Sequence, residues 1–318
     1  MKLPQRIPID PFLGTLLITI AAASLWPARG AASNAIGALT TAAIALLFFL
    51  HGARLPRESL LQAVKHWRLH GLILSLTFLA LPFVTLSLTL LWPELLAREL
   101  WLGILFLSAL PSTVQSAIAF TSMAQGNIAA SVTSAAVSNL VGIALTPLLV
   151  GLLTHAQSEA VSFSGVWKIV LQLLLPFTLG HLFRPLIGPW AGRRKRLLQF
   201  TDRGTIVLAV YSAFSAAVVA GIWRQVSPAS LAVMMAVCLA LLILMLGLST
   251  YLARRLGFTR EDEISIVMAG TQKSLATGVP MARVLFSQAD MGAAILPLMI
   301  YHQSQMFLCS WLARRYSR

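Results

Sequence analysis

The chain has 318 residues, of which 58% are apolar and only 11% are charged, and its mean hydropathy is +0.81. Soluble domains carry about 25% charged residues, so this chain has too little charge to solvate a globular surface. A cytosolic enzyme, a nucleic-acid-binding domain and a disordered chain are therefore excluded. The 24 Lys and Arg residues, against 10 Asp and Glu, lie mostly in short gaps between long apolar runs, and both cysteines stand alone within such runs. This pattern is typical of a polytopic membrane protein.

Ten apolar runs are long enough to cross a bilayer, which takes roughly 20 apolar residues per helix. The sequence therefore predicts an all-α integral membrane protein with ten transmembrane helices. In chain order the predicted spans cover residues 11–27, 35–51, 70–92, 99–124, 127–153, 165–187, 204–223, 229–252, 263–287 and 290–313, and polar residues interrupt the fourth and the ninth.

The distribution of basic residues indicates the orientation. With both termini in the cytoplasm, 18 Lys and Arg residues fall in cytoplasmic segments and only four fall outside, namely Arg29, Arg98, Lys168 and Arg224. Positive charge in short loops favours the cytoplasm. We therefore expect a multi-pass protein of the cell inner membrane with both termini cytoplasmic.

Two segments leave alternatives open. Lys2 and Arg6, followed by an apolar run, are compatible with a cleaved signal peptide, although Trp26-Pro27 at the end of the run favours a retained first span. Over residues 53–69, apolar residues at helical spacing alternate with basic ones. That pattern favours a helix lying on anionic membrane lipid over a regulatory or partner-binding segment.

The fourth and ninth spans contain polar stretches rich in helix-breaking residues. They read Ser108-Ala-Leu-Pro-Ser-Thr-Val-Gln-Ser116 and Gly270-Thr-Gln-Lys-Ser274, and each is followed by a helix of small residues. The two stretches lie five spans apart, and an odd repeat length inverts the second half relative to the first. We therefore expect two inverted five-helix repeats, residues 1–158 and 159–318, within one membrane domain.

Broken helices at membrane depth have a functional implication. Their free N–H and carbonyl groups cannot face lipid and must be satisfied by a neighbouring segment, a water or a ligand. Matching interruptions in two halves indicate the binding site of a transporter. Small residues also allow close helix packing, but the two amides Gln115 and Gln272 need polar partners. The candidate substrate- or ion-binding residues are Thr113, Gln115, Ser116, Asn127, Ser131, Thr271, Gln272, Lys273 and Ser274.

In the motifs LPSTVQSAIAFTSMAQGNIAASV and GTQKSLATGVPMARVLF the chain resembles the bile acid:sodium symporter family, solute carrier family 10, and above all its divergent bacterial SBF-like branch. The resemblance covers essentially the whole chain. It implies ten spans in two inverted halves, with the fourth and ninth helices unwound where they cross. It also implies transport coupled to sodium.

The resemblance further implies ion ligands. Gln272 matches the family's ninth-helix Gln, and Ser131 matches a sodium-ligating hydroxyl. Gln115 and Ser116 lie near the family's fourth-helix ligands, so these four residues are the candidate sodium ligands. Two positions depart from the family pattern. Met268 stands where the family has a sodium-coordinating Glu, and Lys273 adds a cation beside the Gln.

Three roles stay open for Lys273. As a fixed cation it would substitute for a coupling ion or pair with an anionic substrate, and as a desolvated amine it would couple transport to protons. Alternatively, it would bond a carbonyl and hold the broken helix together. All ten carboxylates fall in tails, gaps or helix ends, so no mid-membrane acid supports proton coupling.

The sequence predicts a secondary active transporter, a sodium- or proton-coupled symporter that moves a small organic anion by alternating access. It contains no constellation of an intramembrane protease or lipid transferase and no phosphate-binding loop, so we expect no enzyme activity and no cofactor other than a sodium ion. The alternatives are a non-transporting membrane regulatory protein and an uncoupled efflux carrier on the same fold. The expected partners are the anion and membrane lipid, not nucleic acid. The sequence specifies neither the substrate nor the oligomeric state.

Overall fold

The computed structural model describes residues 11–54, 65–155, 163–221, 227–287 and 290–317, and every regular element within these ranges is helical. In chain order the elements are α1 (Pro11–Leu25), α2 (Gly30–Arg54), α4 (Trp67–Ser75), η1 (Leu76–Ala80), α5 (Leu81–Leu91), η2 (Pro93–Leu95), α6 (Arg98–Ala109), α7 (Gln115–Met123), α8 (Ile128–His155), α9 (Phe163–Leu182), α10 (Arg184–Arg193), α11 (Lys195–Val219), α13 (Pro228–Arg255), α14 (Arg260–Thr271), α15 (Leu275–Leu285) and α16 (Met291–Tyr316). Of the two short elements, η1 is a π-helical turn and η2 a 3-10 turn.

Each of the ten predicted spans corresponds to one helix or to consecutive helices. Five helical stretches within the described ranges are long and apolar enough to cross a membrane by length and composition alone, namely Gly30–Arg54, Trp67–Leu91, Ile128–Thr154, Arg196–Val219 and Pro228–Arg255. The chain is therefore a multi-pass membrane protein, and it is all-helical over the ranges that the structure describes. Most of the predicted lipid-surface helix (residues 55–64) and the basic residues of the signal-peptide alternative (residues 1–10) lie outside the described residues.

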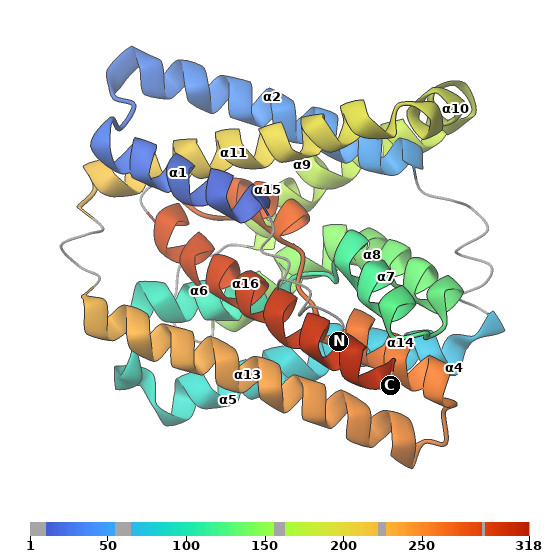
Figure 1. The fold of residues 1–318 in the computed structure, drawn as a ribbon. Helices are drawn as coiled ribbons and strands as arrows, with labels where there is room; N and C mark the ends of the chain where they lie inside the picture. Colours follow the sequence, from blue (N-terminus) through green and yellow to red (C-terminus); the bar gives the residue numbers. More distant parts are fainter. Residues whose placement is uncertain (1–10, 55–64, 156–162, 222–226, 288–289, 318) are drawn as a thin grey trace, which may run out of the picture.

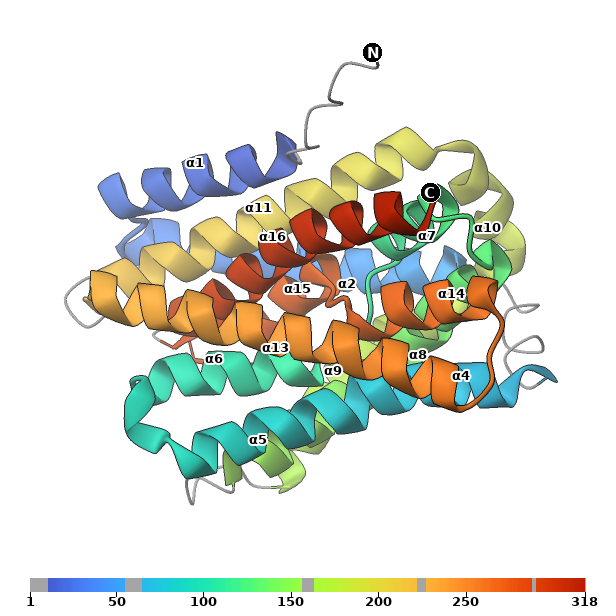
Figure 2. The same cartoon turned by 60° about the horizontal axis from the view of Figure 1, so that its bottom comes forward.

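The helices form two groups that lie side by side (Figures 1 and 2). We call α1, α2, α9, α10 and α11 the outer group, in which α2 packs on α9, α10 and α11 and α1 packs on α11. The remaining helices form the broken-helix group, in which α16 packs on α6, α13 and α15. Contacts of α8 with α9, and of α11 with α15 and α16, join the two groups.

Two helices of the second group are interrupted. Helix α6 ends at Ala109 because Pro111 keeps the preceding Leu110 in an extended conformation, with φ −74° and ψ 151°. Helix α14 ends where Gln272 becomes extended, with φ −82° and ψ 146°. Both α6 and α14 have 12 residues. Twelve residues make about 18 Å of helix, too short for a hydrocarbon core of about 30 Å.

Helices α2 and α9 pack backbone to backbone at two glycines. A Cβ atom at Gly180 would overlap the carbonyl of Phe49, and one at Gly52 would overlap the carbonyl of Phe177. Membrane helices use small residues in this way because lipid provides no hydrophobic drive for helix association. The two glycines therefore set the spacing of these helices.

We expect Gly180→Ala to push α2 and α9 apart and to lower the free energy of unfolding by about 1–3 kcal/mol, the usual cost of overpacking. Thermal unfolding of the detergent-solubilised protein measures this loss. The matched control is Gly204→Ala in α11, where nothing lies within 4 Å of an added Cβ. If the two variants are equally stable, the glycines do not set the helix spacing.

Candidate functional site

The two helix interruptions meet in space, and we call residues 110–114 and 272–274 the crossing. The Ser274 N–H donates to the Pro111 carbonyl at 2.9 Å. The Ser112 hydroxyl donates to the Ala269 carbonyl, 157 positions away in the chain, at 2.5 Å. Main-chain groups freed by one interruption are thus satisfied in part by the other.

Three predicted residues form a hydrogen-bonded triad at the crossing. The hydroxyls of Thr113 and Ser116 lie 3.0 and 2.6 Å from Oε1 of Gln272, to which they donate. Gln272 is fully buried, and its Nε2 donor finds no acceptor among the described residues. An unsatisfied buried donor is costly, so this amide is able to bind a water or a ligand oxygen.

Lys273 is fully buried, and three backbone carbonyls hold its ammonium group. The Nζ atom donates to the carbonyls of Thr77 at 2.8 Å, Ser108 at 2.7 Å and Leu110 at 2.7 Å. It also lies 5.8 Å from the centre of the Phe78 ring. An ammonium has three donors, so these bonds use its full capacity. Of the roles that the sequence left open, the structure shows carbonyl binding, and this arrangement leaves no donor for a substrate.

The Thr77 carbonyl is free to accept from Lys273 because it lies in the π-helical turn η1. Within this turn the Leu81 N–H donates five residues back, to the Leu76 carbonyl. The next donor in that register would be Pro82, which has no N–H to offer the Thr77 carbonyl. The Thr77 carbonyl is therefore available to Lys273.

The other two carbonyls are free because α6 ends. In a continuous helix the Ser108 carbonyl would accept from the Ser112 N–H. That N–H instead donates to the Ser138 hydroxyl on α8 at 3.0 Å. Leu110 lies in the extended break, so its carbonyl is also outside any helical ladder. The interruption of α6 thus supplies two of the three acceptors for Lys273.

Two amides that the sequence interpretation missed complete the crossing. The Gln305 side chain on α16 accepts from the Lys273 N–H at 2.8 Å and donates to the Lys273 carbonyl at 3.0 Å. The Asn139 side chain on α8 donates to the Ser112 carbonyl at 2.9 Å. Amides inside long apolar helices need polar partners, and this signal was available in the sequence.

Three other predicted residues lie outside the triad. Gln115 lies at the start of α7 and lines a cavity. The Ser131 hydroxyl pairs with that of Thr121 at 2.7 Å, and the Asn127 amide donates to Asp262 at 2.8 Å. Ser131 therefore joins α7 to α8, and Asn127 joins the segment before α8 to the start of α14.

Thr271 and Ser274 satisfy groups at helix ends. The Thr271 hydroxyl donates to the Val267 carbonyl of its own helix at 2.7 Å, and the Thr271 carbonyl accepts from the Tyr301 hydroxyl at 2.9 Å. The Ser274 hydroxyl caps α15 by accepting from the Thr277 N–H at 3.2 Å. Both side chains are thus engaged in local hydrogen bonds.

The four predicted sodium ligands have different hydrogen-bond partners or surroundings. Ser116 and Gln272 belong to the triad, whereas Gln115 lines the cavity and Ser131 is bonded to Thr121. Met268, at the position of the family's carboxylate, is buried in an apolar cluster that includes Phe120, Ala124, Ile264, Cys309 and Ala313. The sodium site built from these four residues therefore stays a prediction.

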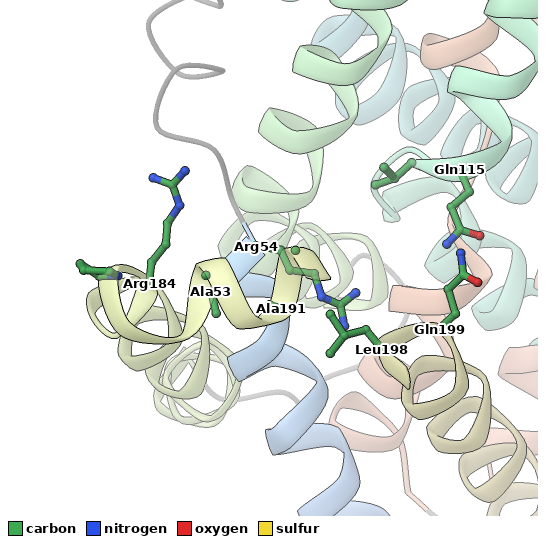
Figure 3. Close-up of a pocket in the computed structure, with 11 residues that line it drawn as sticks. Ala53, Arg54, Gln115, Arg184, Ala191, Leu198 and Gln199 are labelled. Carbon is green, nitrogen blue, oxygen red and sulfur yellow. The ribbon is translucent and has the colours of Figure 1, made fainter. Parts of the chain in front are cut away.

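A cavity of about 770 Å³ lies between the start of α7 and the helices α2, α10 and α11 (Figure 3). We call it the basic cavity, and its lining residues are Ala53, Arg54, Val114, Gln115, Arg184, Pro185, Gly188, Ala191, Gly192, Leu198 and Gln199. The side chains of Gln115 and Gln199 point toward one another across it. Two guanidinium groups and two amides are therefore its polar side chains, and none of the lining residues carries a carboxylate.

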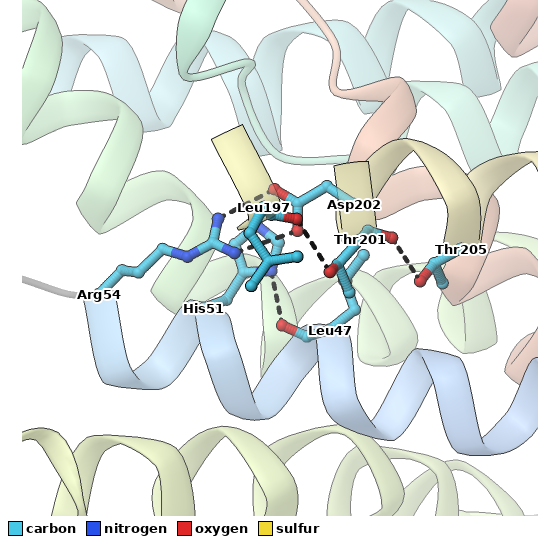
Figure 4. A network of polar contacts seen from close by, with 7 residues as sticks. All are labelled: Leu47, His51, Arg54, Leu197, Thr201, Asp202 and Thr205. Atoms are coloured by element: carbon cyan, nitrogen blue, oxygen red, sulfur yellow. Dashed lines mark hydrogen bonds and ion pairs between the residues drawn. The ribbon is translucent and has the colours of Figure 1, made fainter. Parts of the chain in front are cut away.

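An ion pair fixes Arg54 at the wall of this cavity (Figure 4). Its Nη1 and Nη2 atoms donate to the two carboxylate oxygens of Asp202 on α11 at 2.9 and 3.3 Å. Within α2, the His51 Nδ1 atom lies 2.8 Å from the Leu47 carbonyl. Bidentate pairing has a defined geometry, so α2 and α11 hold the Arg54 guanidinium in one orientation.

Comparison with known proteins gives one family match and several full-length relatives. Residues 10–318 match the SBF-like CPA transporter family. The chain is 48% identical to "Uncharacterized protein PA2026" of Pseudomonas aeruginosa, over 100% of this chain and 96% of the relative. It is 49% identical to "Putative symporter YfeH" of Escherichia coli, over 98% and 93%. It is 29% identical to "Sodium/bile acid cotransporter 7" of Xenopus tropicalis, again over 98% and 93%.

We expect Gln305→Leu to destabilise the crossing, because it leaves the Lys273 N–H and carbonyl buried without partners. Each unsatisfied group costs about 1–3 kcal/mol, so the free energy of unfolding should fall by about 2–4 kcal/mol, as thermal unfolding in detergent would measure. Ser304→Ala is the control, since the Ser304 hydroxyl donates only within its own helix, to Ile300. A Gln305→Leu variant as stable as the control would show that the crossing does not depend on α16.

Proposed function

Because the chain belongs to the SBF-like CPA transporter family, we propose that it is a secondary active transporter that moves a small organic anion across the inner membrane by alternating access. The family match and the cotransporter relatives confirm the resemblance to bile acid:sodium symporters that the motifs indicated. A transported substrate follows from this family. That this substrate is an anion is our proposal. The proposed transport includes no enzymatic step.

The basic cavity is the observation that supports an anionic substrate. It places the Arg54 and Arg184 guanidinium groups and the amides of Gln115 and Gln199 around one space of about 770 Å³. Guanidinium and amide N–H groups are strong donors to carboxylate and sulfonate oxygens. A volume of this size suits a small organic ligand. Arg54 is already paired with Asp202, so the excess positive charge of the lining comes from Arg184. The amides of Gln115 and Gln199 add N–H donors for an anion.

We propose that the ten helical segments are ten spans, arranged as two inverted five-helix halves at residues 1–158 and 159–318. The two interrupted helices are the fourth and ninth segments, which supports an inverted repeat. The distribution of 18 against four basic residues supports cytoplasmic termini. In this orientation the basic cavity, with Arg54 and Arg184, lies on the cytoplasmic side.

The cavity also suggests which parts move. Gln115 belongs to the broken-helix group, whereas Arg54, Arg184 and Gln199 belong to the outer group. The crossing is bonded internally by main-chain and side-chain contacts, so we propose that the broken-helix group moves as one body. Its displacement against the outer group would close the basic cavity and open a path on the opposite side.

We propose that the proton, rather than sodium, is the coupling ion. No carboxylate lies at mid-membrane to carry it, so the proton would cross with the bound anion. The sequence has no phosphate-binding loop, so an ion gradient must supply the energy. Ser131 is bonded to Thr121 and Gln115 lines the basic cavity, and this placement supports a coupling ion other than sodium. A proton that moves with the anion would also neutralise its charge, which lowers the cost of crossing an apolar protein.

We expect Gln115→Ala and Gln199→Ala each to lower anion uptake roughly 10- to 100-fold, because a hydrogen bond to a charged partner contributes about 1.5–3 kcal/mol. Uptake of radiolabelled taurocholate and of radiolabelled pyruvate into proteoliposomes is the measurement. Ser87→Ala on α5, outside the cavity lining, is the control. Unchanged uptake in both glutamine variants would contradict the assignment of the cavity.

The same proteoliposomes test the coupling. Wild-type uptake should continue when choline replaces sodium and should rise when the external pH is lowered. Loss of uptake in choline would establish sodium coupling instead. Equilibration of the label without accumulation would favour an uncoupled carrier, and failure of both anions to enter would favour a non-transporting regulatory protein.

A further inference from the structure

The Lys273 ammonium lies where the carbonyl dipoles of three separate chain segments converge. Thr77 lies in the π-helical turn, Ser108 in the last turn of α6, and Leu110 in the extended break. All three carbonyls are within 2.7–2.8 Å of Nζ. Backbone carbonyls arranged around one point are the groups with which proteins replace the hydration shell of a monovalent cation. We call these three carbonyls the carbonyl cage.

The charge of the ammonium is balanced by dipoles rather than by an acid. Among the described residues, no carboxylate is bonded to Lys273. The C-terminal end of α6 contributes the partial negative charge of a helix terminus, and the Phe78 ring faces Nζ at 5.8 Å. The cage therefore has the features of a cation site whose cation is part of the chain.

A substrate-binding role for Lys273 fits the geometry poorly. The side chain is 0% exposed, and all three N–H donors point to main-chain oxygens. Lys273 is also absent from the lining of the basic cavity, to which the broken-helix group contributes Val114 and Gln115. An anion in that cavity would have to displace a carbonyl to reach the ammonium.

We propose that Lys273 is a tethered cation that occupies the carbonyl cage in place of a free monovalent cation. It joins the break in α14–α15 to α6 and to the π-helical turn, and it cannot exchange with solution because it is covalently attached. If the chain transports as proposed above, no cation enters or leaves at this point during transport. This consequence for coupling rests on the proposed function. The cage itself is testable without transport.

The test replaces the tethered cation by a free one. Lys273→Ala removes three carbons and the nitrogen, which together have the size of n-propylammonium. In choline chloride we expect the unfolding temperature of the purified variant to fall by roughly 6–12 °C relative to wild type, as losing several buried hydrogen bonds would produce. Added n-propylammonium chloride should restore most of this loss with a saturable dependence on concentration.

Three controls make the test specific. The uncharged analogue 1-propanol at the same concentration should not restore stability, and Lys65→Ala, at an exposed position, should unfold like wild type. Wild type should show no saturable stabilisation when sodium chloride replaces choline chloride. This last measurement needs no variant, so it holds even if Lys273→Ala is not recovered folded.

Several results would overturn the inference. Lys273→Ala as stable as wild type in choline would show that the cage needs no cation. Equal rescue by 1-propanol and n-propylammonium would show that only the space matters. A saturable sodium effect on wild type would show a free cation site that the ammonium does not replace. Loss of anion transport alone would bear on the proposed function and not on the cage.

Discussion

The bonds between the Lys273 ammonium and the carbonyls of Thr77, Ser108 and Leu110 are the contact on which the rest of the crossing depends. Two helices are interrupted within an apolar protein, and each interruption frees main-chain groups that lipid cannot satisfy. One side chain satisfies two carbonyls freed by the break after α6 and a third in the π-helical turn. Lys273 lies at the second interruption and bonds carbonyls at the first. Neither break is therefore satisfied without the other.

The remaining groups of the crossing are satisfied by helices that pack on it. Gln305 of α16 bonds both main-chain groups of Lys273, and Asn139 and Ser138 of α8 bond the main chain at Ser112. This density of bonds makes the crossing a rigid body. The basic cavity, in contrast, is divided between the two helix groups. The broken-helix group contributes Gln115, whereas the basic side chains come from α2 and α10 of the outer group. Rigidity at the crossing and a divided cavity are together what an alternating-access mechanism requires.

Much of this arrangement was predictable from local sequence. Long apolar runs predicted the helical segments, and Pro111 with its polar neighbours predicted the break that α6 and α7 flank. The sequence also indicated that the Gln272 amide needs a polar partner, but it did not identify Thr113 and Ser116 as that partner. The family resemblance also directed attention to both interruptions.

The sequence could not indicate which partner each polar side chain would bond. A side chain at the end of a broken helix has several neighbours within reach, and nothing local indicates that Lys273 bonds carbonyls while Gln115, in the other interrupted segment, lines a cavity. Ser131 likewise pairs with Thr121, because the packing of α7 on α8 decides its partner. The cavity combines residues from distant helices, so no motif marks Gln199. Gln305 was detectable as an amide in an apolar helix, but its partner depends on how α16 packs.

The proline that follows the π-helical turn has a consequence for how this chain tolerates change over evolution. Pro82 withholds an N–H from the Thr77 carbonyl, and the lysine at position 273 fills the vacancy. A residue with an N–H at position 82 would compete for that oxygen, and a neutral residue at position 273 would leave it without a donor. The two positions are far apart in the chain, yet each alters the fitness cost of replacing the other. Their substitutions are therefore expected to be inherited as a pair, a compensatory unit that links the start of α5 to the break after α14.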